Sequence, residues 1–161
     1  MDVLEYAIKM ELEGEQYYRE QMEINKNNRL YSVCRILAED EKRHARILEN
    51  KRKGLPYELE DKDALAAVRN VFSDEPDFDA EGKAMPSQLD FYRMALGLEK
   101  ESIELYNNFL TNADSDEEKE IFRYLVEQER QHFRLLDEMV ALLRHAEEWV
   151  ESAEFGIRGD Y

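Results

Sequence analysis

The 161-residue sequence has one cysteine, three prolines, six glycines and no long apolar run. Because Cys34 is the only cysteine, neither an intrachain disulfide nor a cluster of cysteine ligands can form. Few prolines and glycines, together with 37% charged residues, favour long helices over a turn-rich sheet protein. No segment approaches the roughly 18 apolar residues that cross a bilayer, so no membrane span is predicted.

Basic residues are scarce relative to acidic ones. The 22 Lys and Arg against 38 Asp and Glu give a net charge of −16, which argues against nucleic acids and anionic membranes as partners. The first residues show neither the basic start nor the apolar stretch of a secretory signal. We therefore expect a single domain, with a core of substantial size, in the reducing cytoplasm.

Four segments carry apolar residues at alternating steps of three and four, which is the pattern of a helix that buries one stripe. These segments are residues 4–22, 30–48, 89–110 and 122–143. Polar breaks at 25–28 and 112–115 separate the members of each pair. Pro86 and Ser115 have the character of helix starts.

A long connection, at about 52–85, joins the two helix pairs and has room for one short helix near 61–72. Two tight helical hairpins joined by one long crossover predict an all-α, ferritin-like four-helix bundle over residues 1–145. Residues 146–161 form an acidic C-terminal tail, which we expect to pack on the bundle or on a second subunit.

The two halves of the sequence are related by a shift of 88 residues. This shift superimposes two Glu-x-x-His pairs and two lone glutamates, each 30 residues upstream of its pair. It also maps Tyr18 onto Tyr106 and Leu37 onto Leu125. The repeated residues match the ligand set known for two-metal sites inside four-helix bundles: Glu11, Glu41 with His44, Glu99, and Glu129 with His132.

All four glutamates lie in the middle of an apolar stripe that carries no Lys or Arg. Burying an unpaired carboxylate costs several kcal/mol, so we expect cations to neutralise them. Two divalent ions would balance four carboxylates, and oxygen and nitrogen ligands suit iron or manganese, with zinc also possible. We predict one ion held by Glu11 and His44, a second held by Glu99 and His132, and Glu41 and Glu129 bridging both.

Tyr18 and Tyr106 lie two helical turns after Glu11 and Glu99 on the same face. As candidates for a catalytic role, each phenol would hydrogen-bond a ligand carboxylate across the bundle and orient it. Tyrosine at helical spacing can equally be ordinary core, and both interpretations stay open. Glu15 lies either at the edge of the bundle or near the site as a spare carboxylate.

The residues around the predicted ligands resemble the four helices of the rubrerythrin branch of the ferritin-like superfamily. The similar segments are 7–18, 37–44, 98–106 and 127–132, and the resemblance covers about residues 2–145. It implies two iron ions that react with hydrogen peroxide or dioxygen. It also implies a homodimer, and an external electron donor such as a rubredoxin, since one cysteine cannot form an iron domain of that type.

The sequence departs from rubrerythrin three residues after Glu99, where that family has a second glutamate and this chain has Ser102. The repeat partner of Ser102 is Gly14, and the six-ligand set is closer to the bacterioferritin ferroxidase pattern. We expect these two small residues to leave space beside the metals for the oxidant. Three functions follow: reduction of peroxide or dioxygen in oxidative-stress defence, iron oxidation for storage or detoxification, and a non-catalytic bundle stabilised by zinc or manganese.

Overall fold

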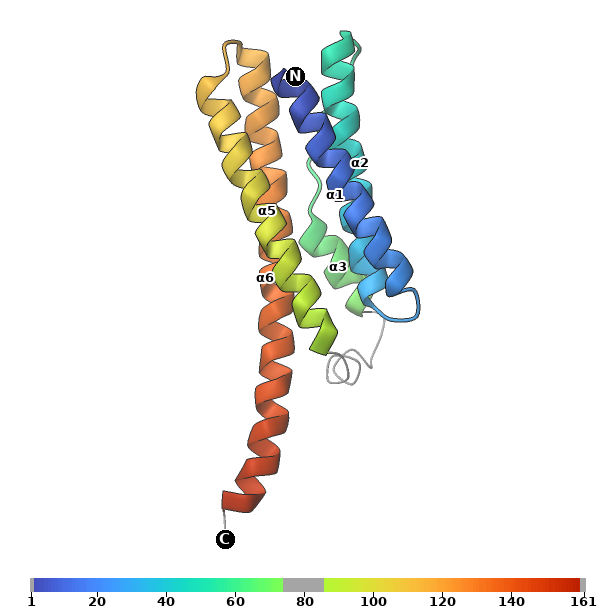
Figure 1. The fold of residues 1–161 in the computed structure, drawn as a ribbon, viewed down its shortest axis with the longest axis vertical. Coiled ribbons are helices and arrows are strands. Elements are labelled where there is room, and N and C mark those ends of the chain that lie inside the picture. Colours follow the sequence, from blue (N-terminus) through green and yellow to red (C-terminus); the bar gives the residue numbers. More distant parts are fainter. Residues whose placement is uncertain (1, 74–85, 160–161) are drawn as a thin grey trace.

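A computed structural model describes residues 2–73 and 86–159, and it shows five helices and no strand in those two ranges. The prediction of an all-α protein is confirmed (Figure 1). The helices are α1 (Val3–Ile24), α2 (Leu30–Lys53), α3 (Ala64–Ser73), α5 (Pro86–Asn112) and α6 (Asp116–Gly159).

The four long helices form two antiparallel hairpins, one of α1 with α2 and one of α5 with α6, which pack side by side (Figure 1). Within each hairpin, the break between the two helices lies at the polar segment where the sequence predicted it. The short helix expected near 61–72 is present as α3, which packs against α2 and α6. Most of the second half of the crossover, residues 74–85, lies outside the described residues.

Local contacts define where the helices begin and end. The carboxylate of Asp2 accepts a hydrogen bond from the Glu5 N–H (2.8 Å) and caps α1. The Ser115 hydroxyl accepts one from the Glu118 N–H (3.1 Å), which confirms the predicted start of α6. The helix α2 stops at Gly54, whose φ of 70° is a left-handed conformation that favours glycine.

Two hydrophobic clusters fill the bundle, one on each side of its middle. One contains Ala7 and Ile8 of α1 together with Leu48, Tyr106 and the buried apolar side chains of α6 from Ile121 to Val126. The other contains Tyr18 together with buried apolar side chains of the first turns of α2, of α3, of the described start of α5, and of α6 from Leu135 to Val140. The predicted ligands lie between the two clusters along every helix, so apolar packing closes the site at both ends.

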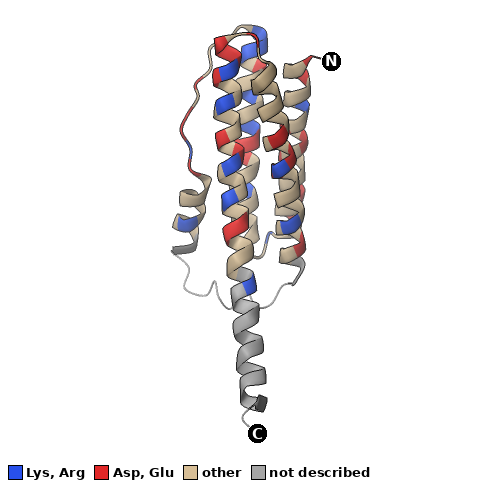
Figure 2. Ribbon diagram, turned by 90° about the vertical axis from the view of Figure 1, so that its left-hand side faces the viewer, with Lys and Arg blue, Asp and Glu red and all other residues tan. Residues whose placement is uncertain are grey.

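The outer surfaces of the helices carry Lys and Arg interspersed with Asp and Glu (Figure 2). None of the helices, over the residues described, is long and apolar enough to span a membrane. The helix α6 continues without a break past residue 145 to Gly159. The side chains of residues 146–161, which were predicted to pack on the bundle or on a second subunit, lie outside the part of the chain that the structure describes.

Candidate metal centre

All six predicted ligands are buried at the middle of the bundle, with 0 to 4% of each residue exposed. One comes from α1, two from α2, one from α5 and two from α6. Their oxygen and nitrogen atoms form two overlapping groups of four residues, and within each group the ligand atoms lie within 4.8 Å of one another. Two of the six residues belong to both groups.

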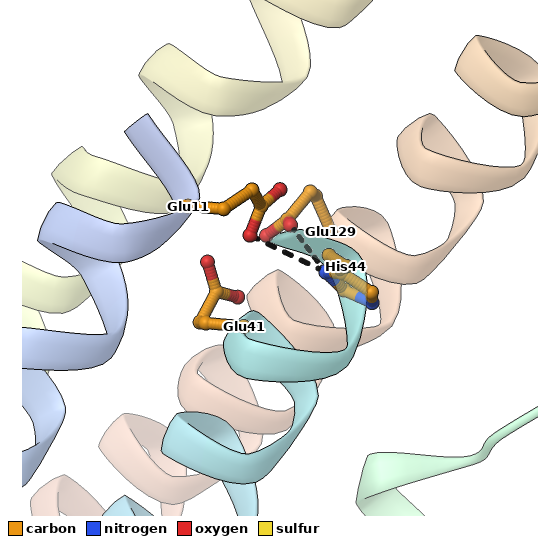
Figure 3. A group of neighbouring side chains, drawn as sticks. All are labelled: Glu11, Glu41, His44 and Glu129. Atoms are coloured by element: carbon orange, nitrogen blue, oxygen red, sulfur yellow. Dashed lines mark hydrogen bonds and ion pairs between the residues drawn. The ribbon is translucent and has the colours of Figure 1, made fainter. Parts of the chain in front are cut away.

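The first group consists of Glu11, Glu41, His44 and Glu129 (Figure 3). Nδ1 of His44 lies 3.2 Å from Oε1 of Glu129 and 3.5 Å from Oε2 of Glu11. The imidazole therefore presents Nδ1, not Nε2, to the carboxylates. Three helices supply this group, so the fold brings together residues up to 118 positions apart in the sequence.

The second group consists of Glu41, Glu99, Glu129 and His132. Nδ1 of His132 lies 3.1 Å from Glu41, 3.4 Å from Glu99 and 3.5 Å from Glu129. Glu41 and Glu129 are thus the two residues shared by both groups, and they occupy the places at which the sequence predicted bridging ligands.

The two tyrosines make the cross-bundle hydrogen bonds that one interpretation of the sequence anticipated. Tyr18 donates to Oε1 of Glu99 (2.6 Å), and Tyr106 donates to Oε1 of Glu11. Burial, reinforced by the nearby carboxylates, raises the pKa of both phenols well above the usual value, so both remain protonated donors. Tyr18 corresponds to Tyr106, and Glu11 to Glu99, under the 88-residue repeat, so exchanging the two halves of the chain exchanges the two contacts. This is the expected result of a pseudo-two-fold arrangement.

Behind each imidazole lies a side chain that the sequence did not identify. Nε2 of His132 is 2.9 Å from Oδ2 of Asp40, and Nε2 of His44 is 3.4 Å from Oε1 of Gln128. Partners of this kind hold a histidine in the tautomer that leaves Nδ1 free for a metal. The 88-residue repeat could have identified them, because Asp40 and Gln128 each directly precede the glutamate of a Glu-x-x-His pair and are themselves 88 residues apart.

Arg43 joins these two partners. It lies 2.5 Å from Oδ1 of Asp40 and donates to Oε1 of Gln128 at 2.6 Å. The amide of Gln128 also donates to the backbone carbonyl of Lys62, in the described part of the crossover (3.1 Å). The chain between α2 and α3 therefore helps to orient a side chain behind the site.

The buried glutamates fall into two electrostatic classes. Burial, and then the neighbouring carboxylates, raise the pKa of Glu41 and Glu129 well above the usual value. Burial also raises the pKa of Glu11, but the facing imidazole of His44 and hydrogen bonds with Glu41 and Tyr106 together outweigh it, and the pKa falls to about 2. In Glu99, burial is likewise outweighed by His132 together with hydrogen bonds with Glu129 and Tyr18, which lower the pKa.

Burial disfavours the charged form of both imidazoles, yet the facing carboxylates raise the pKa of His44 and, more strongly, of His132. Without metal, these shifts favour imidazolium–carboxylate pairs and the neutral form of Glu41 and Glu129. Protons are thus a second means of neutralising these carboxylates, beside the cations that the sequence predicted. A metal that binds here must displace those protons.

The donor atoms fit two divalent cations. Several buried donor atoms have no hydrogen-bond partner: Oε2 of Glu11, Oε1 of Glu41, Oε2 of Glu99, Oε2 of Glu129 and Nδ1 of His132. Buried polar atoms without a hydrogen bond are rare in folded proteins, and these five all belong to the two overlapping groups. Carboxylate oxygens and imidazole nitrogens without sulfur suit iron, manganese or zinc.

A groove of about 690 Å³ between α1 and α5 reaches the site from the surface. Gly14, Tyr18, Glu41, Glu99 and Ser102 are among the residues that line it. A Cβ atom at Gly14 would lie 2.9 Å from Oε2 of Glu41, so a side chain there would meet the carboxylate. The two small residues that the sequence singled out therefore lie along an opening that leads to the site.

Two other residues considered in the sequence lie away from the site. Glu15 accepts from Nε of Arg19 (2.7 Å), an ion pair within α1, and belongs to neither ligand group. Cys34 is fully buried in the hydrophobic cluster of α2, and burial raises the pKa of its thiol to about 12. It behaves as a small apolar side chain.

Comparison with known proteins places the chain in a family. A family model described as Rubrerythrin matches residues 2–140, nearly the whole chain and all six candidate ligands. No curated protein matches the sequence, and no solved structure matches it either.

Proposed function

This chain belongs to the rubrerythrin family, and from that membership we propose that it is a cytoplasmic di-iron oxidoreductase that reduces hydrogen peroxide or dioxygen. The observation that carries the proposal is the pair of overlapping ligand groups, which share Glu41 and Glu129. Two ions that share two carboxylates lie close enough to act on one small molecule. A single-metal site would need only one of the groups.

When bound, a pair of ferrous ions would supply the two electrons that, with two protons, convert hydrogen peroxide to two waters. The residues of the chain hold this arrangement in place. Tyr18 and Tyr106 orient the carboxylates of Glu99 and Glu11, and the partners behind the histidines keep Nδ1 directed inward. The hydrophobic clusters exclude water at both ends of the site.

The groove between α1 and α5 is the proposed path of the oxidant. It reaches Glu41 and Glu99 from between α1 and α5, whereas α3 packs against α2 and α6. Peroxide and dioxygen are small compared with the groove, so steric access is unrestricted as long as Gly14 and Ser102 keep their size. The electrons for further turnovers would come from an external donor such as a rubredoxin, and we propose a homodimer as the active unit.

The direct test is anaerobic loading with ferrous iron, followed by stopped-flow absorbance after mixing with peroxide or with dioxygen. We expect two irons per chain, and oxidation of both by one equivalent of peroxide. Glu129→Gln, which removes a shared ligand, should lose at least one iron. Glu127→Gln, an exposed glutamate on the same helix, is the matched control and should retain both. An absence of bound iron, or of a spectral change with either oxidant, would refute the proposal.

A second candidate function is iron oxidation for storage or detoxification, with iron as the substrate. It is favoured by Ser102, which stands where rubrerythrin has an additional glutamate; its hydroxyl contacts the sulfur of Met10 (3.8 Å). Light scattering separates the two functions, since storage requires a closed multi-subunit shell and a peroxidase does not. The third function, a non-catalytic bundle, predicts zinc or manganese instead of iron in the purified protein.

A further inference from the structure

The two candidate metal positions are matched in their glutamates, histidines and tyrosines, but not in what lies behind the histidines. The carboxylate of Asp40, on α2, contacts Nε2 of His132 on α6 at 2.9 Å. Gln128, on α6, occupies the symmetric place behind His44 on α2, at 3.4 Å. An anion thus stands behind one imidazole and a neutral amide behind the other.

Arg43 increases this difference. Its guanidinium lies 3.4 Å from Nε2 of His44 and donates to Gln128. It reaches His132 only through Asp40, using the carboxylate oxygen Oδ1, while Oδ2 contacts the imidazole. The residue 88 positions after Arg43 is Gln131, so the second half of the chain has no equivalent cation.

We infer that the two metal positions are unequal, and that the position made by Glu99 and His132 binds a divalent ion first and more tightly than the position made by Glu11 and His44. The inference rests on the proposed two-metal function. It assigns to Asp40 and Gln128 a positioning role that sets the order of binding.

The physical reason is the basicity of the two imidazoles. A histidine whose outer N–H donates to a carboxylate becomes a stronger ligand, because the negative charge stabilises positive charge on the ring and on the bound ion. The amide of Gln128 offers a weaker acceptor, and its oxygen is shared with Arg43. The nearby guanidinium also repels a cation at the His44 position.

The orientation of Gln128 makes the asymmetry a fixed property of the fold. Its Nε2 donates to the carbonyl of Lys62 and its Oε1 accepts from Arg43, so the oxygen faces His44. The amide therefore accepts from the imidazole and holds its tautomer, but adds no charge. Because both ligand groups contain Glu41 and Glu129, this outer difference is the main one between the two positions.

Zinc is a suitable probe because it is redox-inert and is compatible with these ligands. Calorimetric titration with Zn²⁺ should resolve two steps. Anomalous diffraction at the zinc edge, from crystals of protein with one equivalent, should place most of the zinc beside His132. Asp40→Asn should weaken the tighter step by about 10- to 100-fold and change the weaker step much less. Circular dichroism establishes that the variant is folded.

The exchange variant Asp40→Gln with Gln128→Asp supplies the decisive comparison. It should move the first zinc from the His132 position to the His44 position. Equal occupancy at one equivalent, a first zinc beside His44 in the natural sequence, or equal weakening of both steps by Asp40→Asn would overturn the inference while leaving a two-metal protein. A chain that binds no zinc and no iron would overturn both this inference and the proposed function.

Discussion

Tyr18 and Tyr106 show how single residues prepare this site before any ion arrives. Each phenol crosses the bundle to hold one carboxylate oxygen of the opposite hairpin, and each is buried. The second oxygen of the same carboxylates makes no hydrogen bond. A carboxylate oriented in this way loses less conformational entropy when it binds a metal.

Replacing Tyr106 with phenylalanine should lower the affinity for zinc by about 10-fold, because Glu11 would lose the donor that orients it. Calorimetric titration measures the change. Tyr92→Phe is the matched control, since Tyr92 is also buried but belongs to the hydrophobic cluster. An affinity in Tyr106→Phe equal to that of the control would mean that the hydrogen bond has no role in metal binding.

Gly14 controls the space beside Glu41. In Gly14→Leu, the new side chain would meet Oε2 of Glu41 and occupy the groove. We expect oxidation of the ferrous protein by peroxide to slow by at least about 10-fold, measured by stopped-flow absorbance. Gly97→Leu is the control, because nothing lies within 4 Å of a Cβ there. Equal rates in the two variants would exclude the groove as the path of the oxidant.

At the scale of the helices, the site depends on where each helix begins relative to its partners. The start of α6 is defined by the Ser115 cap, and an ion pair between Lys51 and Glu117 links the end of α2 to the first turn of α6. The side chains of Glu129 and His132 lie about four turns further along α6. Correct capping therefore favours the register that brings them to the middle of the bundle.

Ser115→Ala removes this cap and should lower the free energy of unfolding by about 1 kcal/mol, measured by urea denaturation. Ser115→Asp should retain most of the stability, since its carboxylate can accept the same hydrogen bond from Glu118. The zinc stoichiometry should be unchanged in both variants, because the cap is far from the ligands. A stability loss equal in the two variants would contradict the assignment of Ser115 as a cap.

At the scale of the whole molecule, the buried site makes the free energy of unfolding depend on pH. The direction of this dependence should differ between the metal-free and the metal-bound protein. In the metal-free protein, the pKa values of His44, His132, Glu41 and Glu129 are raised in the folded state. Unfolding releases protons from these groups whenever the pH is above their usual pKa. Their contribution is therefore fully present at low pH and is lost as the pH rises through the folded-state values.

We predict that the metal-free protein loses unfolding free energy as the pH rises above the usual histidine pKa of about 6.5, by about 1.4 kcal/mol per pH unit for each extra proton that the folded state retains. Glu11, with a pKa of about 2, acts in the opposite direction only as the pH falls below about 4.5, outside this window. Urea denaturation in the presence of a chelator measures the slope. A flat or rising profile would contradict the charge balance described above.

With two equivalents of zinc the slope should reverse. Protons and metal compete for the same oxygens and nitrogens, so affinity rises with pH and the folded state gains stability from the bound ions. Opposite slopes for the two forms of one protein would distinguish titration within the site from titration on the exposed surface. Surface groups should contribute nearly equally to both profiles.

The sequence alone was enough to determine the helices, the hairpins and the six candidate ligands. A stripe of apolar residues with helical spacing encodes which face of each helix is buried, and that information is local. The shift of 88 residues added a relation between the halves, and through it the sequence anticipated the tyrosine contacts across the bundle. It also placed the two small residues beside the site, where the groove lies.

Only the tertiary structure showed what lies behind the histidines and how the site is neutralised without metal. Asp40 and Arg43 look like surface residues of a charged helix in the sequence, and they become partners of the site because α2 and α6 pack at a particular distance and rotation. The pKa shifts of the carboxylates likewise depend on distances between groups on different helices. Such distances are set by the packing of the whole bundle, which no local pattern encodes.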